Sequence, residues 1–286
     1  MIGKFEHIIK LLPYFRLARL HRPLPMLLLL WPCFMGLAIS NGSWLDYLIF
    51  LIGAAATRSA GCVINDMVDQ SFDRYVERTK TRPLAAKTLN TRQALGAVVF
   101  FLSISFGIWL CLNQMAKYLS LFGILLMVVY PYTKRLTNWP QLFLGATFNY
   151  GLLVAVAHAG ILSLSILSLF LSLLVWTVFY DTIYAFADLK DDLKIGVKST
   201  AIIMQKAPKI CLTCCNVLIH GLILGFLQSY GWISIILVCM GFIYLQMILI
   251  RWRVTDPQNC IKTFNNCHFW GLGLWVGLEF IRIIAP

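Results

Sequence analysis

Long apolar segments, each close to the length of a membrane-spanning helix, follow one another through this chain of 286 residues. A helix needs about 20 mostly apolar residues to cross the hydrocarbon core of a bilayer. The candidate segments lie at about 23–40, 45–64, 94–112, 118–133, 140–159, 161–180, 210–230, 231–250 and 267–285. Charged residues make up only 13% of the chain, about half the roughly 25% of a soluble domain. The sequence therefore excludes a soluble globular protein and predicts an all-α membrane protein with about nine transmembrane helices, eight or ten being the alternatives.

The basic residues test this count, because the cytoplasmic loops of membrane proteins carry an excess of Lys and Arg. With nine spans and the N-terminus in the cytoplasm, 22 of the 24 basic residues fall on the cytoplasmic side, Arg58 among them. Only Lys117 and Arg282 fall on the other side. The predicted orientation thus has the N-terminus and the charged loops in the cytoplasm. Most of the formal net charge of +12 is then explained by the orientation of the chain in the membrane. Nucleic-acid binding is excluded because the loops are too short to form a soluble basic domain.

No linker, repeat or low-complexity segment divides the chain, so we expect a single polytopic domain over residues 1–286. Residues 1–22 are basic and amphipathic and lack a small-residue cleavage site, which predicts an uncleaved helix lying in the membrane interface rather than a signal peptide.

Most of the nine cysteines lie inside apolar runs, where a thiol packs as a small hydrophobe. Cys211, Cys214 and Cys215 lack the partner cluster that a zinc site needs, so packing is the favoured interpretation.

Eight of the twelve acidic residues gather in two clusters. In the first cluster Asn65, Asp69 and Asp73 are spaced four residues apart, so a helix places them on one face, and Asp66 lies beside them. In the second cluster Asp188 and Asp192 are again four apart, and a continuous helix would put Asp181 on the same face. Both clusters are expected at cytoplasmic ends of spans.

Stacked acids are unfavourable unless a cation lies between them, because like charges at this spacing destabilise a helix. Carboxylates and an Asn amide offer the all-oxygen ligands that Mg²⁺ prefers, and Mg²⁺ accepts phosphate oxygens as its remaining ligands. The alternative is a pair of ordinary solvated charged loops. Two spaced runs that hold two-thirds of all acids favour a Mg²⁺ site completed by a diphosphate. The predicted metal ligands are Asn65, Asp66, Asp69, Asp73, Asp188 and Asp192.

Basic and aromatic residues flank both acidic clusters. The bases expected to contact a diphosphate are Arg78, Arg135, Lys194 and Lys198, although membrane topology alone also explains bases at these positions. Tyr130 and Tyr184 lie near the same ends of their spans, where their π faces could stabilise a developing cation. An aromatic belt at the membrane interface is the alternative interpretation of the tyrosines.

The sequence motifs around the two acidic clusters resemble those of a known family. NDMVDQSFD, followed by RTKTRPLA, resembles the NDxxDxxxD motif and the trailing RTxxRPL of the UbiA-type intramembrane prenyltransferases. YDTIYAFADLKDDLKIGVKST resembles the second aspartate motif of that family. LLLLWP at 27–32 and YPYTKR at 130–135 are closest to the branch that acts on 4-hydroxybenzoate. The resemblance runs from about Arg19 to Ala201, and beyond it only the topology matches.

The resemblance implies a ring of nine transmembrane helices around a central cavity, capped by the two acidic loops on the cytoplasmic side. It implies Mg²⁺ as cofactor and transfer of a polyprenyl group from a polyprenyl diphosphate to an aromatic acceptor. For this branch the acceptor is 4-hydroxybenzoate, in ubiquinone biosynthesis, at the bacterial inner membrane or, in a eukaryote, the mitochondrial inner membrane. Position by position, Asp69, Asp73, Asp188 and Asp192 correspond to the catalytic aspartates, and Arg135 to a diphosphate-binding base.

One departure from the family concerns the start of the first span. The family usually has R/K-P-I-G there, whereas this chain has Arg22, Pro23, Leu24 and Pro25. Arg19 or Arg22 is expected to hold the benzoate carboxylate, because Arg forms bidentate pairs with carboxylates. The remaining alternatives are another acceptor, such as a naphthoate, haem or homogentisate-like ring, and a cation transporter that uses the aspartates as an ion path.

Overall fold

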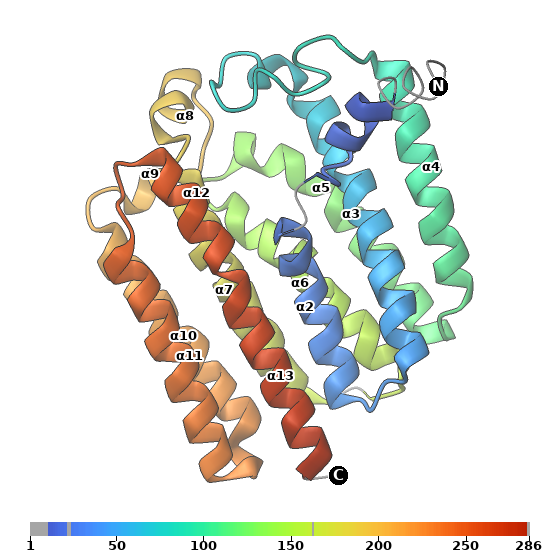
Figure 1. Ribbon diagram of the computed structural model, residues 1–286, viewed down its shortest axis with the longest axis vertical. Coiled ribbons are helices and arrows are strands. Elements are labelled where there is room, and N and C mark those ends of the chain that lie inside the picture. Colours follow the sequence, from blue (N-terminus) through green and yellow to red (C-terminus); the bar gives the residue numbers. More distant parts are fainter. Residues whose placement is uncertain (1–10, 22–23, 162, 285–286) are drawn as a thin grey trace, which may run out of the picture.

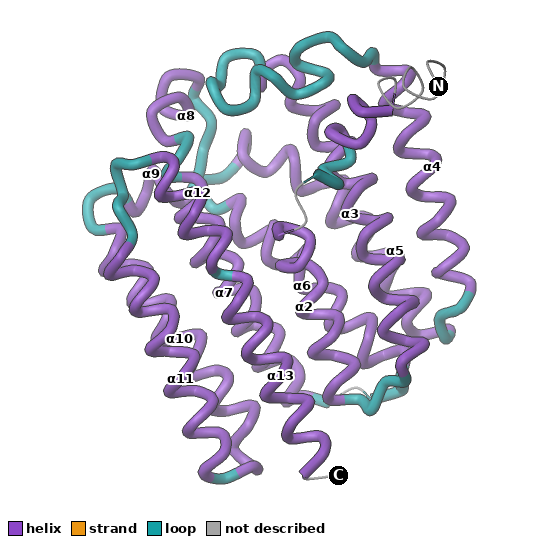
Figure 2. Tube along the Cα trace, in the orientation of Figure 1, coloured by secondary structure: helices purple, strands orange, loops and turns teal. Residues whose placement is uncertain are grey.

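The computed structural model describes residues 11–21, 24–161 and 163–284. Every regular element in these residues is a helix (Figure 2). The bounds are α2 Leu24–Ile39, α3 Trp44–Asp73, α4 Thr91–Leu110, α5 Gln114–Leu136, α6 Pro140–His158, α7 Leu164–Ala185, α8 Leu189–Ile195, α9 Thr200–Met204, α10 Pro208–Leu227, α11 Trp232–Arg251, α12 Pro257–Asn266 and α13 His268–Ile284. Of the segment 1–22, expected to form an interfacial helix, residues 11–21 are described, and residues 11–17 are helical.

The nine expected spans correspond to α2, α3, α4, α5, α6, α7, α10, α11 and α13. Eight helical stretches are long and apolar enough to cross a membrane, the last of them combining α12 and α13 over 257–284. The ninth span, α2, is an apolar helix of only 16 residues and contains Pro32. The prediction of an all-α membrane protein with about nine spans is therefore confirmed.

Helix starts follow local sequence signals. Ser43 and Asp46 form a capping box at the start of α3, and Asn90 and Gln93 form another at the start of α4. Such caps satisfy backbone N–H groups that have no partner within the helix. The short helix α8 ends at Gly196 with a left-handed φ of +72°, a backbone conformation that favours glycine. The chain is thereby redirected toward α9 at the end of the bundle that carries the acidic clusters.

The spans pack unevenly around the molecule (Figure 1). α2 lies against α3, α6 and α13, while α7 lies between α6 and α10. The largest buried core joins α2, α6, α7, α10, α11 and α13, and it is filled by large side chains such as Trp176, Phe179 and Leu173. A separate core joins α2, α3, α5 and α6 through residues such as Phe50 and Tyr150. Open space within the bundle therefore lies on the side formed by α2 to α6.

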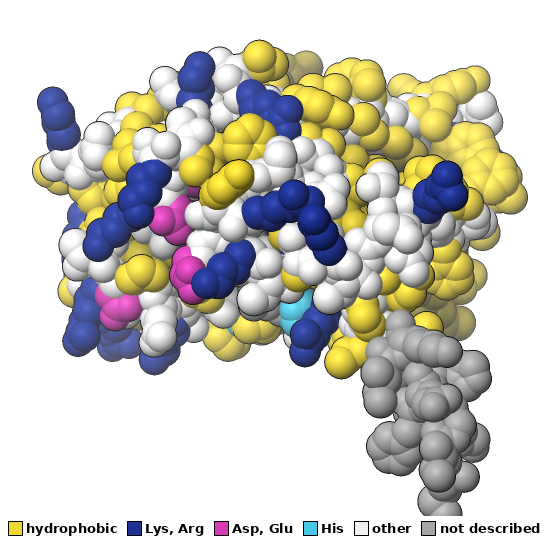
Figure 3. All heavy atoms as spheres, turned by 90° about the horizontal axis from the view of Figure 1, so that it is seen from above, with side chains coloured by type: hydrophobic (Ala, Val, Ile, Leu, Met, Phe, Trp, Pro, Cys, Tyr) yellow, Lys and Arg dark blue, Asp and Glu magenta, His cyan; other side chains and the backbone are white. Residues whose placement is uncertain are grey.

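Charged side chains gather at one end of the bundle. Figure 3 looks onto this end and shows Lys and Arg side chains around a few acidic ones. The two long connections at this end are 74–90, after α3, and the segment around α8 (Figures 1 and 2). Two bases lie at the opposite end of the bundle: Lys117, near the start of α5, and Arg282, near the end of α13.

Two sequence-based expectations need correction. Arg58 was counted with the bases of a loop, yet it lies well inside α3, because this helix runs on to Asp73. Asp181, Asp188 and Asp192 do not share the face of one continuous helix. α7 ends at Ala185, and the chain turns through Phe186 before α8 begins. The turn separates Asp181 from the rest of the second cluster. The seven-residue spacing between Asp181 and Asp188 therefore does not place them on one helix face.

Candidate active site

A polar cavity of about 190 Å³ lies at the charged end of the bundle, where α3, α5, α6, α7 and α8 meet. Side chains of both acidic clusters line this cavity: Asn65, Asp69, Asp73, Asp188 and Asp192. The two motifs are more than 100 residues apart in the sequence, and the fold brings them to one cavity. This is the central prediction about the site, and the observed lining is consistent with it.

The acids of the first motif are deeply buried on the last turns of α3. Asp66 and Asp69 are each 1% exposed and Asp73 is 6% exposed. The amide of Asn65 donates a hydrogen bond to Asp69 Oδ2 at 3.1 Å, as the four-residue spacing on a helix allows. Buried carboxylates are costly unless they are paired and hydrogen-bonded. Partners from other segments are therefore required.

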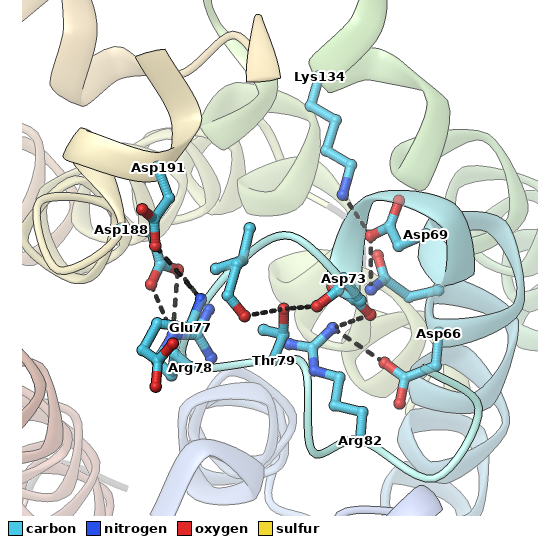
Figure 4. A network of polar contacts seen from close by, with 12 residues as sticks. Asp66, Asp69, Asp73, Glu77, Arg78, Thr79, Arg82, Lys134, Asp188 and Asp191 are labelled. Atoms are coloured by element: carbon cyan, nitrogen blue, oxygen red, sulfur yellow. Dashed lines mark hydrogen bonds and ion pairs between the residues drawn. The ribbon is translucent and has the colours of Figure 1, made fainter. Parts of the chain in front are cut away.

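Three basic residues supply these partners, and Figure 4 shows two of them, Arg82 and Lys134. Arg82 Nη1 donates to Asp66 Oδ1 at 3.1 Å and to Asp73 Oδ2 at 2.8 Å, so one guanidinium holds two carboxylates. Arg19 Nη2 donates to the same Asp66 oxygen at 2.7 Å. Lys134 Nζ, from the last turn of α5, pairs with Asp69 Oδ2. The first motif is thus cross-linked to the 74–90 segment and to α5.

The second motif is tied to the same segment. Arg78 Nε donates to both carboxylate oxygens of Asp188, at 2.8 and 3.1 Å, and its guanidinium carbon lies 4.7 Å from the centre of the Tyr184 ring. The backbone N–H of Glu77 donates to Asp191 Oδ2 at 3.3 Å. The segment 74–90 therefore bridges the acids at the end of α3 and those around α8.

The cavity shifts the pKa values of its lining groups. Burial alone would lower the pKa of the Arg78 guanidinium, but Tyr184 and the hydrogen-bonded Asp188 raise it above its usual value. Asp66 and Asp73 likewise raise the pKa of Arg82 against the effect of its burial. Burial, followed by repulsion from Asp188, raises the pKa of the Asp192 carboxyl to about 7. Because nearby cations favour ionised carboxylates, a further cation in this cavity would favour the ionised form of Asp192.

A second, larger cavity of about 650 Å³ continues from the polar one into the bundle. Its walls are mostly apolar side chains of α2 to α6, such as Phe50, Ile108 and Met127. Four residues line both cavities and mark their junction: Asn65, Arg82, Tyr130 and Asp181. Among the described residues, α10, α11 and α13 contribute nothing to either lining. The combined space suits a molecule with a charged head and an apolar body.

Arg58 is a cation of the apolar cavity that the sequence interpretation assigned to a loop. It lines the apolar cavity, and its Nε is buried without a hydrogen-bond partner among the described residues. Arg58 precedes Asn65 by seven residues, so it lies on the same face of α3, about 10 Å further down the axis at 1.5 Å per residue. The sequence did contain a signal for Arg58, because it lies inside an apolar segment. Ionisable residues within membrane spans typically mark functional sites.

The predicted bases and aromatic residues are placed as follows. Lys198 lines the polar cavity, whereas Arg135 donates to the carbonyl of Val68 and lines neither cavity. Lys194 is exposed and lies 3.7 Å from Asp191, outside both linings. Tyr130 lies at the junction of the cavities, and Tyr184 lines the polar one. Arg19 lines the apolar cavity, while Arg22 lies outside the described residues.

The donor set of the polar cavity fits Mg²⁺. Among the described residues, no group of three His, Cys, Asp or Glu side chains is arranged to enclose a metal ion by itself. Mg²⁺ does not need such an enclosure, since it commonly binds one or two carboxylates together with water and phosphate oxygens. Asp69 Oδ1 and Asp66 Oδ2 are buried without a hydrogen-bond partner among the described residues, so each of these two carboxylates keeps one oxygen free. All donors are hard oxygens, as this ion prefers.

An acid-rich polar cavity at the end of an apolar one, inside a bundle of membrane-spanning helices, defines an integral membrane protein with a site for an amphiphilic, anionic ligand. The model of the UbiA prenyltransferase family matches residues 29–273. The chain belongs to this family, as the resemblance in its motifs implied.

Relatives of known name agree with this assignment. The chain is 41% identical to a 4-hydroxybenzoate octaprenyltransferase of Shewanella woodyi over 277 residues, covering 94% of this chain and 96% of the relative. It is also 41% identical to a protein of the same name from a Shewanella species, strain ANA-3, covering 93% and 95%. Neither name favours another acceptor or a transporter.

Solved structures share the fold. A UbiA homologue from Aeropyrum pernix matches with a TM-score of 0.76 at 21% identity, covering 89% of this chain and 97% of that one. A UbiA homologue from Archaeoglobus fulgidus bound to GPP and Mg²⁺ matches with a TM-score of 0.73 at 18% identity, covering 94% and 99%.

Proposed function

We propose that this protein transfers a polyprenyl group from a Mg²⁺-bound polyprenyl diphosphate to 4-hydroxybenzoate, at the ring carbon ortho to the hydroxyl, and releases diphosphate. The step belongs to ubiquinone biosynthesis. The observation that carries the proposal is the junction of two cavities: acids and bases line the polar one, and an apolar space of about 650 Å³ opens directly from it. The names of the relatives, and the GPP and Mg²⁺ of a structural neighbour, support it.

The residues that would hold Mg²⁺ are Asp69, Asp73, Asp188 and Asp192, with the Asn65 amide. Asp66, also predicted as a ligand, lines the apolar cavity and not the polar one, and it is paired with Arg19 and Arg82. When bound, the metal neutralises charge on the diphosphate and makes it a better leaving group. The acids come from both motifs, so the site is complete only when the ends of α3 and α7 lie together. The segment 74–90 holds them in that arrangement through Arg82 and Arg78.

Basic side chains share the stabilisation of the diphosphate. Arg78, Arg82, Lys134 and Lys198 line the polar cavity, and preorganised cations aimed at a leaving group favour its departure. Each of the first three bases is paired with a motif acid. When the diphosphate binds, a basic side chain can exchange its carboxylate partner for a phosphate oxygen. The released carboxylate is then available to bind Mg²⁺. Of the bases named from the sequence, Arg135 and Lys194 would act from outside the cavity.

The apolar cavity protects the reactive carbon. Its walls take the first part of the prenyl chain and exclude water, which would otherwise capture an allylic cation. Tyr130, at the junction of the cavities, presents a ring at the place where that cation develops. The ring face of Tyr184 is already covered by the Arg78 guanidinium. Tyr130 is therefore the better placed of the two predicted tyrosines.

Arg58 is the group we assign to the carboxylate of the acceptor. Arg19, the residue named from the sequence, is engaged by Asp66, whereas Arg58 Nε has no hydrogen-bond partner within the described residues. Arg58 lies on the Asn65 face of α3, about 10 Å deeper along the axis. An aromatic acid bound there points its hydroxyl end toward the junction of the cavities. The Arg58 guanidinium also offers the bidentate geometry that carboxylates accept.

The site end of the bundle is assigned to the cytoplasmic side of the inner membrane. The bases of the described loops at this end follow the positive-inside rule, whereas Lys117 and Arg282 lie at the other end. Cysteine accessibility tests this orientation: a thiol introduced at Lys80 should react with a membrane-impermeant maleimide only after cells are opened.

Product analysis with purified protein tests the function. Geranyl diphosphate and Mg²⁺ are supplied with 4-hydroxybenzoate, a dihydroxynaphthoate, homogentisate or haem, and each product is identified by mass. We expect one prenyl group to be added to 4-hydroxybenzoate and to no other acceptor. A series of longer diphosphates then defines the preferred donor. Prenylation of a different acceptor, or none of 4-hydroxybenzoate, would contradict the assignment.

A further inference from the structure

Ring prenylation leaves one proton to be removed, and no residue named so far receives it. The inference that follows rests on the proposed function. When the new carbon–carbon bond forms, the attacked ring carbon still carries its hydrogen, and the ring regains aromaticity only when that hydrogen leaves as a proton. The base that accepts it must reach the junction of the two cavities, where the allylic carbon and the ring meet.

Asp181, on the last turns of α7, is at that junction. Of the six acids that line one or both cavities, Asp181 alone lines both. Asp66, Asp69, Asp73 and Asp188 are each held by a base within salt-bridge distance, and Asp181 is in no such pair among the described residues. A carboxylate without a paired cation keeps more of its basicity. Asp192, the other unpaired acid, lines only the polar cavity.

A buried amide orients the Asp181 carboxylate. Gln141, near the start of α6, is 5% exposed and hydrogen-bonds Asp181 through its side chain. The backbone N–H of Thr200 donates to Gln141 Oε1 at 3.1 Å, so the oxygen of the amide is occupied. The amide nitrogen is then the group that donates to Asp181, since a Gln side chain donates only through nitrogen. Because the Gln141 amide is neutral, it orients the Asp181 carboxylate without neutralising its charge.

The charges around Asp181 come from several elements. Arg78 from the 74–90 segment and Asp188 at the start of α8 act on it with opposite sign. Tyr130 of α5 and Tyr180 of α7 are the neighbouring phenols. Arg58 of α3 lines the same apolar cavity. An acceptor whose carboxylate is bound at Arg58 would therefore present its hydroxyl end toward Asp181.

We propose that the Asp181 carboxylate is the base that removes the ring proton. The carbon–oxygen bond of the prenyl diphosphate breaks and its electron pair leaves with the diphosphate. The ring carbon ortho to the hydroxyl forms the bond to the allylic carbon. The carbon–hydrogen bond at that ring carbon then breaks, its electrons return to the ring, and the proton passes to Asp181. The protonated acid returns the proton to water after the product leaves.

Asp181→Asn tests the proposal, with 4-hydroxybenzoate carrying deuterium at both carbons ortho to the hydroxyl. General bases contribute about 100-fold or more to rate, so kcat should fall by at least about 100-fold. The KM values for geranyl diphosphate and Mg²⁺ should not change. Proton removal should become rate-limiting, so the variant should show a larger deuterium isotope effect on kcat than the unaltered protein. Single-turnover measurements with enzyme in excess give this value even for a slow variant.

Two further variants complete the test. Asp181→Glu keeps a carboxylate and should recover part of the lost rate. Asp256→Asn is the matched control, because Asp256 caps α12 and lines neither cavity, and Asn caps helices equally well. Full activity of Asp181→Asn, a raised Mg²⁺ requirement, or a slow rate without an increased isotope effect would each overturn the inference. Failure of the unaltered protein to prenylate 4-hydroxybenzoate would instead overturn the proposed function.

Discussion

At the scale of single residues, the site is a set of buried acids that are held by bases from other segments. Arg82 spans Asp66 and Asp73, while Lys134 reaches Asp69 from α5. Breaking a buried pair by removing one partner leaves an uncompensated charge, which is strongly destabilising. The bases therefore do two things: they make buried acids tolerable in the folded protein, and they carry positive charge to the place where a diphosphate binds.

Removal of one motif carboxylate is the first prediction. Asp69→Asn and Asp188→Asn should each lower kcat by about 100-fold or more, as is typical when one electrostatic stabiliser of a transition state is removed. Raising the Mg²⁺ concentration should recover part of the loss if the residue holds the metal. Glu77→Gln is the control, because Glu77 lies in the adjoining segment, is 80% exposed and lines neither cavity. Near-normal rates in both aspartate variants would contradict the metal assignment. Rates are measured with purified protein across a Mg²⁺ series.

Substitution of Arg58 is the second prediction. Arg58→Met should raise the KM for 4-hydroxybenzoate about 10- to 100-fold, since a hydrogen bond to a charged group contributes about 1.5–3 kcal/mol. The KM for geranyl diphosphate should stay the same. The methyl ester of 4-hydroxybenzoate provides the control: the unaltered protein should discriminate against it, and Arg58→Met should not. Equal discrimination by both proteins would show that another group holds the carboxylate, and Arg19→Met is then the variant to compare.

The sequence could predict the acids of the site but not the role of each base. Helical spacing alone places Asn65, Asp69 and Asp73 on one face, and the structure shows them lining one cavity. A base, by contrast, reaches several ångströms from its backbone, so its partner depends on tertiary packing. Lys134 pairs with Asp69 while its neighbour Arg135 turns outward to Val68. Topology counting also hid Arg58, because it treats every base as a marker of a loop.

At the scale of the elements, small residues allow α2 and α6 to approach closely. A Cβ added at Gly36 would lie 2.7 Å from Ala155 Cβ and 2.9 Å from the carbonyl oxygen of Leu152. Small residues at such crossings are typical of membrane helices, because they let backbones come together. This contact closes one wall of the bundle beside the apolar cavity, which Gly151 and Val154 of α6 line.

A substitution at this crossing is the third prediction. Gly36→Ala should destabilise the protein by about 1–3 kcal/mol, the usual cost of overpacking, because the obstructing atoms include backbone that cannot rotate away. Gly96→Ala on α4 is the matched control. A Cβ there meets nothing within 4 Å, so the better helix propensity of Ala should leave stability equal or slightly higher. Unfolding midpoints in one detergent compare the two variants; a stable Gly36→Ala would contradict the close packing of α2 on α6.

The apolar spans were predictable as elements, but the break in the second motif was not. Hydropathy locates a span wherever about 20 apolar residues occur together, which is why all nine segments correspond to helices. The chain from Tyr180 to Asp192 has helix-compatible residues throughout, so the sequence offers no Gly or Pro to mark the turn after Ala185. The turn instead satisfies tertiary contacts: Arg78 holds Asp188, and the Lys198 backbone N–H donates to the Lys134 carbonyl at 3.0 Å.

At the scale of the whole molecule, the helix ends that carry the two acidic motifs are joined by charged contacts, while the spans themselves share an apolar core. The 74–90 segment connects them through the Arg78–Asp188 pair and the hydrogen bond from Glu77 N–H to Asp191. The second half of the bundle, α7 with α10, α11 and α13, packs in an apolar core that also includes α2 and α6. It supplies little to the cavities apart from the end of α7 and α8, so its contribution is to hold the second motif in place.

A ligand that contacts both motifs should therefore stabilise the whole protein, which is the fourth prediction. Binding to the folded state alone adds about 2.7 kcal/mol at a ligand concentration 100 times Kd. Geranyl diphosphate with Mg²⁺ should accordingly raise the unfolding midpoint in detergent. Geraniol with Mg²⁺ should not, because it lacks the anionic head that the polar cavity binds. A chelator should remove the shift caused by the diphosphate.

Asp188→Asn separates bridging from local binding in the same experiment. The variant keeps the acids on α3 but loses one carboxylate of the second motif, so the shift produced by geranyl diphosphate and Mg²⁺ should become much smaller. Glu77→Gln should keep the full shift, since its exposed carboxylate is paired only with Lys80. An undiminished shift in Asp188→Asn would mean that the ligand binds α3 and its bases without the second motif. The stability of the bundle would then be independent of a shared site, although each motif could still bind its own ion.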